Sequence, residues 1–389
     1  MKDLFLLSPD VIFLNHGSFG ACPRPVMARL HALQAEMEAE PVILLDRIAI
    51  ERMAESRAAL GAYLNVPGDD VVYFPNPTTA INMVMRSMLN APPGSRLHLA
   101  PGDEILTSDH EYGAMTRTWR YFCRHSGARL VQREMPLPMS TPEAFAARFW
   151  DGVTARTRVI FLSHITSQTA LIFPVEEIVR RARQAGILCI LDGAHAPAQI
   201  PLDLGALQPD VYTGALHKWL CAPKGTAFLY ARPEIQALLD PLVVSWGYES
   251  EQPGPSRFVD YHEWQGTRDI TPFLTVPTAI AFQQAHDWAA VRADCHRLAV
   301  ETRTRINALT GLESIAPPEW IGQMASVRLP AETDPAALQR WLWEEKRIEI
   351  PVFTWNGQPF LRVSFQAYNT PADADALVSA LETWLAQAR

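Results

Sequence analysis

The sequence lacks several features that would place it in a specialised class of protein. No uninterrupted apolar run reaches the roughly 18 residues that a membrane-spanning helix needs. The apolar start of the chain has no basic stretch of any size and no small-residue cleavage site, so we do not expect a signal peptide. The formal net charge is -8 at pH 7, whereas nucleic acids and anionic membranes require a basic face. We therefore expect neither a nucleic acid nor a membrane as partner.

Cysteine is also scarce. The chain has 5 cysteines among 389 residues, and none stands in a CxxC pair or at the spacing of metal ligands. A scattered, odd set of this kind argues against a disulfide framework and against a metal site. We therefore expect a protein of the reducing cytoplasm without a bound metal.

The composition and the order of segments indicate an α/β protein. Hydrophobic residues make up 48% and charged residues 20%, which is typical of a globular protein, and the length predicts two or three cores. Short apolar runs alternate with amphipathic helical segments between residues 71 and 232. Strands are predicted at 71–75, 103–109, 157–165, 187–195, 210–216 and 225–232, and helices at 78–89, 112–127 and 174–186. This alternation predicts a mainly parallel sheet covered on both faces.

The pattern changes near residue 275. Residues 276–311 are predicted to form one or two long helices. Shorter strand-like and helix-like segments follow up to the C-terminus. The sequence therefore predicts a second, smaller α+β unit after the large one.

Polar side chains follow the predicted strands, at the sheet edge where open α/β folds bind ligands. Thr78 and Thr79 open a helix after the first strand, where they would bind a phosphate or serve only as an N-cap. His110 and Tyr112 follow the second strand, where an aromatic would either stack on a ligand or form the wall of a cleft.

Two further strands end in ionisable residues. Asp192 follows an apolar strand, with His195 three residues later, and a carboxylate there is costly unless it is paired with a cationic ring nitrogen or hydrogen bonded. Lys218, preceded by His217, follows the strand at 210–216. Desolvation lowers the pKa of such a lysine and makes it a nucleophile that forms a Schiff base with a carbonyl.

One ligand accounts for all of these features. It has a phosphate for the threonine-bearing helix, a flat ring for an aromatic side chain, a ring nitrogen for Asp192 and an aldehyde for Lys218. Pyridoxal 5′-phosphate has this combination, and a lysine Schiff base with an acidic partner on the pyridinium nitrogen is its usual protein environment. We therefore predict that it is the cofactor.

Longer motifs carry a resemblance to a known family. They are FLNHGSFGACPRPV at 13–26, DHEYGA at 109–114, HKW at 217–219, QGTRD at 265–269 and RVSFQAYNT at 362–370. With these motifs the chain resembles the class V aminotransferases of the fold-type I pyridoxal phosphate enzymes, and within them the isopenicillin N epimerase-like branch. The resemblance covers nearly the whole chain.

The resemblance implies an architecture. The large domain, residues 21–275, would be a three-layer α/β/α unit with a mainly parallel seven-stranded sheet. Residues 1–20 and 276–389 together would form the small domain. The family further implies a homodimer with shared active sites and an α-amino acid as small-molecule substrate.

The resemblance also implies roles for single residues. Lys218 would form the Schiff base, Asp192 would pair with the ring nitrogen, and His195 would lie near the phenolic oxygen of the ring. Tyr112 would stack on the ring and act as a second catalytic group, with His110 as the second choice for the stacking position.

The phosphate and the substrate have their own implied residues. Thr78, Thr79 and His217 would hold the phosphate, and Thr267 would reach the phosphate of the neighbouring subunit. Arg362 would take the substrate α-carboxylate, and Asn15 and His16 would line the entrance.

Two departures from the family pattern bear on the reaction. Cysteine desulfurases need a cysteine just before the final arginine, and residues 346–364 contain none, so desulfuration is disfavoured. Position 215 is alanine where relatives often carry a phosphate-binding hydroxyl, for which Thr213 or Thr226 would substitute. Epimerisation is the reaction that the branch implies, and β-elimination by a C–S lyase and transamination stay open. A binding protein without catalysis is not expected, because Lys218 and Asp192 are both present.

Overall fold

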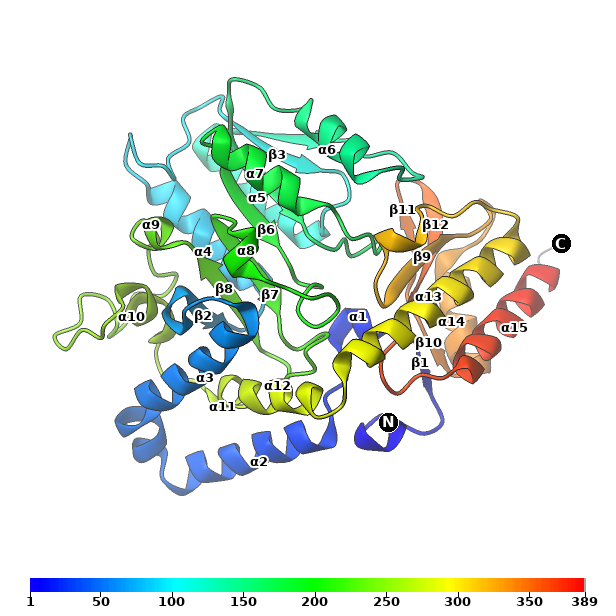
Figure 1. Cartoon of the computed structure of the whole chain (residues 1–389), viewed down its shortest axis with the longest axis horizontal. Helices are drawn as coiled ribbons and strands as arrows, with labels where there is room; N and C mark the ends of the chain where they lie inside the picture. The colour runs from blue at the N-terminus through cyan, green and yellow to red at the C-terminus, as the bar shows by residue number, and fades with distance from the viewer. Residues whose placement is uncertain (388–389) are drawn as a thin grey trace.

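The computed structural model describes residues 1–387 and contains one large and two small sheets (Figure 1). The strands of the large sheet, in spatial order, are β2 (Val71–Phe74), β8 (Ala227–Ala231), β7 (Val211–Ala215), β6 (Leu188–Asp192), β5 (Thr157–Ser163), β3 (Glu104–Ser108) and β4 (Arg129–Arg133). All neighbouring pairs are parallel except the two that involve β8. The seven-stranded, mainly parallel sheet is therefore confirmed.

The reversed direction of β8 follows from its connection. Residues 216–226 link β7 to β8 without a helix, and a parallel crossover needs a longer segment, usually a helix. The same connection carries Lys218, so the candidate lysine lies on a short turn at the carboxyl end of β7.

The two faces of the large sheet are covered by different helices, as the alternation of strand side chains requires. Val159 and Phe161 belong to one apolar core, and Ile160 and Leu162 belong to the other. The first core is closed by α4 (Pro77–Asn90) and α5 (Gly113–Ser126), and the second by α6 (Pro142–Trp150) and α7 (Val175–Gln184). The predicted three-layer α/β/α arrangement is confirmed.

Several helices lie on the side of the large sheet where β2 is the edge strand, and all but the last of them were not foreseen from the sequence (Figure 1). They are α2 (Arg24–Ala39), α3 (Ala49–Leu64), α10 (Arg257–Glu263), α11 (Thr271–Leu274) and α12 (Val276–Gln284). The predicted helical segment at 276–311 is divided into α12 and α13 (Trp288–Thr310). Asp287 causes the break, because it adopts a left-handed backbone conformation (φ 44°) and its side chain caps the N–H of Ala290.

The smaller unit is built on a three-stranded antiparallel sheet. Its order is β11 (Val352–Trp355), β12 (Gln358–Ser364) and β9 (Met324–Arg328). The helices α13 and α14 (Pro335–Lys346) lie against it, and α15 (Pro371–Gln387) packs on these two helices. Near the N-terminus, β1 (Ile12–Phe13) pairs in parallel with β10 (Ile348–Glu349). This pairing supports the proposed assignment of residues 1–20 to the small domain, and the domain boundaries stay a prediction.

The remaining elements are short. They are η1 (Lys2–Leu4), α1 (His16–Phe19), η2 (Ile43–Arg47), η3 (Gly68–Asp70), α8 (Leu204–Leu207), α9 (Pro233–Gln236) and η4 (Pro318–Trp320). Among the helices in residues 1–387, none combines the length and the hydropathy required to cross a bilayer.

The fold yields a first prediction at the edge of the sheet opposite to Lys218. The carboxylate of Asp210 is buried at the start of β7, accepts the N–H of Cys189 at 2.8 Å and pairs with Arg96 and Arg232. Asp210→Ala leaves the N–H of Cys189 and the guanidinium of Arg96 without this acceptor, so we expect the free energy of unfolding to fall by about 2–3 kcal/mol. Urea denaturation measures this change.

A matched control uses the exposed partner of the same arginine. Glu234 also pairs with Arg232, but its side chain is 54% exposed, so Glu234→Ala should change the free energy of unfolding by at most about 0.5 kcal/mol. Equal effects of the two substitutions would show that burial of Asp210 does not matter.

Candidate active site

Lys218 occupies the centre of the candidate site. Its side chain is partly buried in the turn after β7, and its Nζ lies 3.0 Å from Nε2 of His195. Burial, and after it the positive charge of Arg362, lower the pKa of the Lys218 ammonium to about 7. A large share of this amine is therefore neutral, and hence nucleophilic, at neutral pH.

The ring of His195 is oriented by Trp219. The indole Nε1–H of Trp219 donates to Nδ1 of His195 at 3.2 Å, so the neutral imidazole carries its proton on Nε2, which faces the Lys218 amine. Burial lowers the pKa of His195 well below its usual range. His195 is therefore a neutral hydrogen-bond donor toward the reacting amine.

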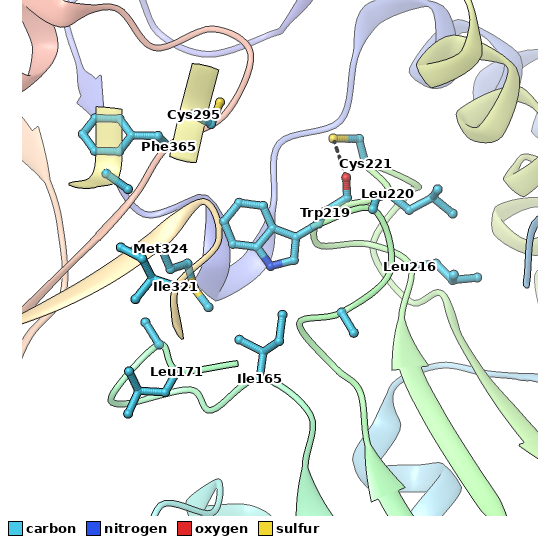
Figure 2. Close-up of a cluster of buried hydrophobic side chains, with 14 of the residues drawn as sticks. Ile165, Leu171, Leu216, Trp219, Leu220, Cys221, Cys295, Ile321, Met324 and Phe365 are labelled. Atoms are coloured by element: carbon cyan, nitrogen blue, oxygen red, sulfur yellow. Dashed lines mark hydrogen bonds between the residues drawn. The ribbon is translucent and has the colours of Figure 1, made fainter. Parts of the chain in front are cut away.

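Trp219 is itself fixed by packing between the large and small units. Figure 2 shows its indole within a cluster of apolar side chains. Ile165 and Leu171 come from the loop after β5, and Ile321 and Met324 come from the start of the small sheet. The indole is completely buried, so a small change of its volume or position would shift His195 and, through it, the surroundings of the Lys218 amine.

The N-terminal segment holds the backbone of the lysine turn. Nε2–H of His16 donates to the carbonyl of Lys218 at 2.9 Å, and Nδ1 accepts from the hydroxyl of Tyr368 at 2.9 Å. Gly20 passes so close that a Cβ there would lie 2.1 Å from the carbonyl oxygen of His217. His16 is buried with both ring nitrogens bonded, so it supports the lysine turn, and its predicted place at the entrance stays a prediction.

Asp192 ends β6 with one carboxylate oxygen available. Oδ1 accepts the N–H of Ala194 at 2.9 Å, and Oδ2 accepts no hydrogen bond from residues 1–387. Burial raises the pKa of this carboxyl group. A cationic ring nitrogen at Oδ2 would favour the ionised form, so the position fits the predicted partner of a pyridinium.

Glu111 is a buried carboxyl group that the sequence analysis did not single out. Its oxygens accept the hydroxyls of Ser108 and Ser163, each at 2.6 Å, and the N–H of Ser163 at 2.9 Å. Ser163 pairs in register with Asp192 on the neighbouring strand. Burial raises the pKa of Glu111 to about 8. Glu111 thus joins the ends of β3 and β5 beside Asp192.

The two candidates for the stacking position have different surroundings. Tyr112 precedes α5 and is 47% exposed. His110 is completely buried, and its ring nitrogens bond Thr169 Oγ1 and the carbonyl of Met135, both at 2.8 Å. His110 is therefore not available to face a ligand, and Tyr112 stays the candidate.

The residues predicted at the phosphate surround the start of α4, which packs against β7 and β8. The backbone N–H and the hydroxyl of Thr79 both donate to Asn76 Oδ1, so its side chain is already used in the helix cap. The hydroxyl of Thr78 has no acceptor within residues 1–387. Thr78 is therefore the better placed of the two for a phosphate oxygen.

His217, in the turn after β7, has one free ring nitrogen. Its Nδ1–H donates to the carbonyl of Thr226 at 3.0 Å, which leaves Nε2 without a proton in the neutral ring. Burial lowers the pKa of His217 to about 4, and a phosphate nearby would raise it. The hydroxyls of Thr213 and Thr226 donate to backbone carbonyls, so neither substitutes for the hydroxyl missing at position 215.

Arg362 is held by its two terminal nitrogens, and its Nε–H is left over. Its two terminal nitrogens donate to the carbonyl of Ser167 and to the hydroxyl of Ser18 at 3.0 Å, whereas its buried Nε has no acceptor. Ser18 in turn donates to Asn15 Oδ1, so Asn15 supports the arginine through a serine. Burial lowers the pKa of Arg362 to about 10, so it stays charged at neutral pH. The orphaned Nε–H suits a carboxylate oxygen.

Thr267 is not hydrogen bonded to any of these groups. It is exposed in the segment after α10, and its side chain makes no hydrogen bond within residues 1–387. Its role at the phosphate of a second subunit stays a prediction.

The donor set fits pyridoxal 5′-phosphate. The chain offers a neutral buried amine at Lys218, an available carboxylate oxygen at Asp192 and a free hydroxyl at Thr78. The residues described contain no group of three or more histidine, cysteine, aspartate or glutamate side chains arranged to hold a metal ion. The chemistry of the site is therefore that of an amine, a carboxylate and neutral imidazoles.

Comparisons with known proteins place these residues in context. The sequence profile of the family Aminotransferase class-V matches residues 13–377. The chain is similar to isopenicillin N epimerase of Amycolatopsis lactamdurans (38% identical, 97% of this chain and 96% of the relative). It is also similar to isopenicillin N epimerase of Streptomyces clavuligerus (37% identical, 97% of this chain and 96% of the relative).

More distant relatives and solved structures share the fold. A probable chloroplastic L-cysteine desulfhydrase of Arabidopsis thaliana is 28% identical over 96% of this chain and 82% of the relative. The apo structure of a cysteine desulfurase from Thermococcus onnurineus NA1 superposes with a TM-score of 0.83 at 18% identity, over 99% of this chain and 97% of that one. This last likeness concerns the fold alone.

The lowered pKa of Lys218 yields the second prediction. Only the neutral amine attacks an aldehyde, so with the protein freed of cofactor the rate of Schiff-base formation with pyridoxal should fall as the pH drops through about 7. An ordinary lysine would instead lose reactivity already below its usual pKa of about 10.4. Stopped-flow absorbance gives the rate, and borohydride trapping with mass spectrometry identifies the modified residue. A midpoint near the ordinary lysine value would contradict the burial argument.

Proposed function

The chain belongs to the class-V aminotransferase family, and on that premise we propose that it is a pyridoxal 5′-phosphate-dependent enzyme that epimerises an α-amino acid substrate. The observation that carries the choice of reaction is the similarity to two isopenicillin N epimerases, at 38% and 37% identity over 97% of the chain. The cysteine desulfhydrase relatives are 29% identical or less.

The proposed role of Lys218 is to take the proton from the substrate Cα on one face, and to supply it on that face in the reverse direction. When bound, the cofactor withdraws electrons and so acidifies that proton. Lys218 suits this role because burial holds the pKa of its amine near 7, close to the operating pH. His195 keeps the amine oriented through its Nε2–H. The free carboxylate oxygen of Asp192 would hold a proton on the ring nitrogen of the cofactor.

Arg362 is proposed to orient the substrate. Its charged guanidinium would bind the α-carboxylate through the free Nε–H, while Ser167 and Ser18 hold the rest of the group in place. Asn15 contributes by fixing Ser18 and does not need to touch the substrate.

Epimerisation needs a second proton donor on the face of the substrate opposite to Lys218. Tyr112 is our candidate, because its exposed hydroxyl makes no hydrogen bond within residues 1–387 and is free to exchange a proton. The phosphate would be held by the free hydroxyl of Thr78 and by His217. Thr79 would contribute by keeping the cap of that helix in place, because its N–H and hydroxyl both donate to Asn76 Oδ1.

Elimination is the second candidate function. The relatives named L-cysteine desulfhydrase, one of them 29% identical over 95% of the chain, favour it. A persulfide-forming desulfurase is disfavoured, because the one cysteine beyond Cys221 is Cys295, which is buried in α13 and whose pKa burial raises to about 12.

We further propose a cytoplasmic homodimer. Thr267 is exposed and lies where the family motif would bring it to the phosphate of the other subunit. Five cysteines without a disulfide in the described chain are compatible with a reducing compartment.

The third prediction separates the possible reactions. Incubation of the holoenzyme with a panel of single amino acid stereoisomers in D₂O should give α-deuterated substrate with loss of optical purity, because an epimerase exchanges the α-proton with solvent. NMR and chiral chromatography measure both. Release of an α-keto acid and sulfide would establish elimination instead, and Lys218→Ala should abolish either reaction together with the visible band of the bound cofactor.

The fourth prediction concerns the second proton donor. Tyr112→Phe keeps the aromatic ring and removes the hydroxyl, so we expect the rate of epimerisation to fall by about 10²-fold or more. Exchange of the α-proton should persist for one stereoisomer, because Lys218 still serves its own face. Cofactor absorbance of the variant should match that of the wild type. Equal loss of exchange for both stereoisomers would argue against a role for Tyr112 on one face.

A further inference from the structure

A hairpin of the small sheet contacts the loop that carries Tyr112, although the two segments are far apart in the sequence. We propose that the tip of the β11–β12 hairpin, residues Trp355 and Asn356, is a positioning element for Tyr112 and couples it to Arg362. The proposal rests on the proposed function, in which Tyr112 and Arg362 act on one substrate.

The tip has a rigid geometry. Trp355 pairs with Gln358, so only Asn356 and Gly357 form the turn. Both have positive φ, 46° and 75°, as a two-residue turn of type I′ requires, and Asn-Gly is the sequence that best accommodates it. A hairpin with so short a turn has little freedom to move its tip independently of its strands.

Two separate contacts join this tip to the loop after β3. Asn356 Nδ2–H donates to Asp109 Oδ2 at 3.1 Å, and Asp109 Oδ1 accepts the N–H of Met135 at 2.9 Å. The indole of Trp355 packs on the ring of His110, with 4.6 Å between the ring centroids. The tip therefore contacts two successive residues of the loop that leads to Tyr112.

The loop transmits these contacts to Tyr112 because every residue in between is fixed. Both ring nitrogens of His110 are hydrogen bonded, and the carboxyl group of Glu111 bonds the ends of β3 and β5. Tyr112 follows directly and is the exposed member of the loop. A shift at Asp109 or His110 therefore has no flexible segment in which to be absorbed before Tyr112.

The same hairpin carries Arg362. This residue lies on β12, the central strand of the small sheet, four residues or about 14 Å of strand away from Gln358, the partner of Trp355. A second connection runs through the large domain, because Ser167, which accepts from Arg362, and Thr169, which bonds His110, belong to one loop. Movement of Arg362 with the small sheet would therefore reach both sides of the Tyr112 loop.

The test inverts the polarity of the tip contact. Asn356→Asp keeps a side chain that tolerates positive φ but places a carboxylate opposite Asp109. Asp109→Asn/Asn356→Asp restores the bond with donor and acceptor exchanged, while one amide oxygen still accepts the N–H of Met135. Gln358→Ala, at an exposed position of the same hairpin, is the control.

We measure α-proton exchange in D₂O for each stereoisomer with the four holoenzymes. The single variant should slow exchange on the Tyr112 face by about three- to fivefold, with partial recovery at high salt, and leave exchange on the Lys218 face within about twofold of wild type. The double variant and the control should both behave as wild type. A uniform loss on both faces, or no recovery in the double variant, would overturn the coupling.

A second measurement does not depend on turnover. Hydrogen–deuterium exchange should show faster exchange of the backbone amides at 110–114 in the single variant, and protection restored in the double variant. Unchanged protection at 110–114 would overturn the proposal even if the enzyme catalyses elimination. Absence of α-proton exchange in the wild type, with the protection pattern as expected, would contradict the proposed function and leave the contact established.

Discussion

The hydrogen bond from the indole of Trp219 to His195 is the interaction on which the arrangement of the site depends. It sets the tautomer of His195 and so determines that the lysine amine meets an N–H rather than a lone pair. The indole that makes this bond is buried between the two units of the chain (Figure 2). The protonation of Lys218 therefore depends on the packing between the two units. A loss of packing around Trp219 would disturb His195 and, through it, the Lys218 amine.

Burial determines the charge state of most groups around Lys218. It lowers the pKa of Lys218 to about 7, raises that of Glu111 to about 8 and lowers that of His217 to about 4. These shifts favour the neutral forms of the three groups. Arg362 remains charged at neutral pH, because burial lowers its pKa only to about 10. A ligand that brings both an anionic phosphate and a cationic ring nitrogen would restore charge at His217 and Asp192, so binding energy and protonation would be linked.

The sequence predicted the groups that follow strands and missed the groups that support them. Asp192, Lys218 and Tyr112 were recognisable because the carboxyl ends of parallel strands converge on one edge of the sheet. The predicted place of His16 at the entrance rests on its sequence motif. Its contact with the carbonyl of Lys218 joins residues that are 202 positions apart, so no local pattern indicates it. Glu111 could not be recognised from the sequence, because its hydrogen-bond partners are two serines on different strands. Long-range contacts of this kind follow from packing and not from local pattern.

The small sheet limits which reactions the site can perform. The segment before Arg362 forms a hairpin with a two-residue turn that is bonded to Asp109, so this segment is not a long mobile loop. In the proposed reaction, proton transfer at the substrate Cα would fall to Lys218 and to the group opposite it. If the hairpin also holds the loop of that second group, substrate binding at Arg362 and the placement of Tyr112 depend on the same rigid element. Specificity for the carboxylate and stereochemical outcome would then be set by one part of the fold.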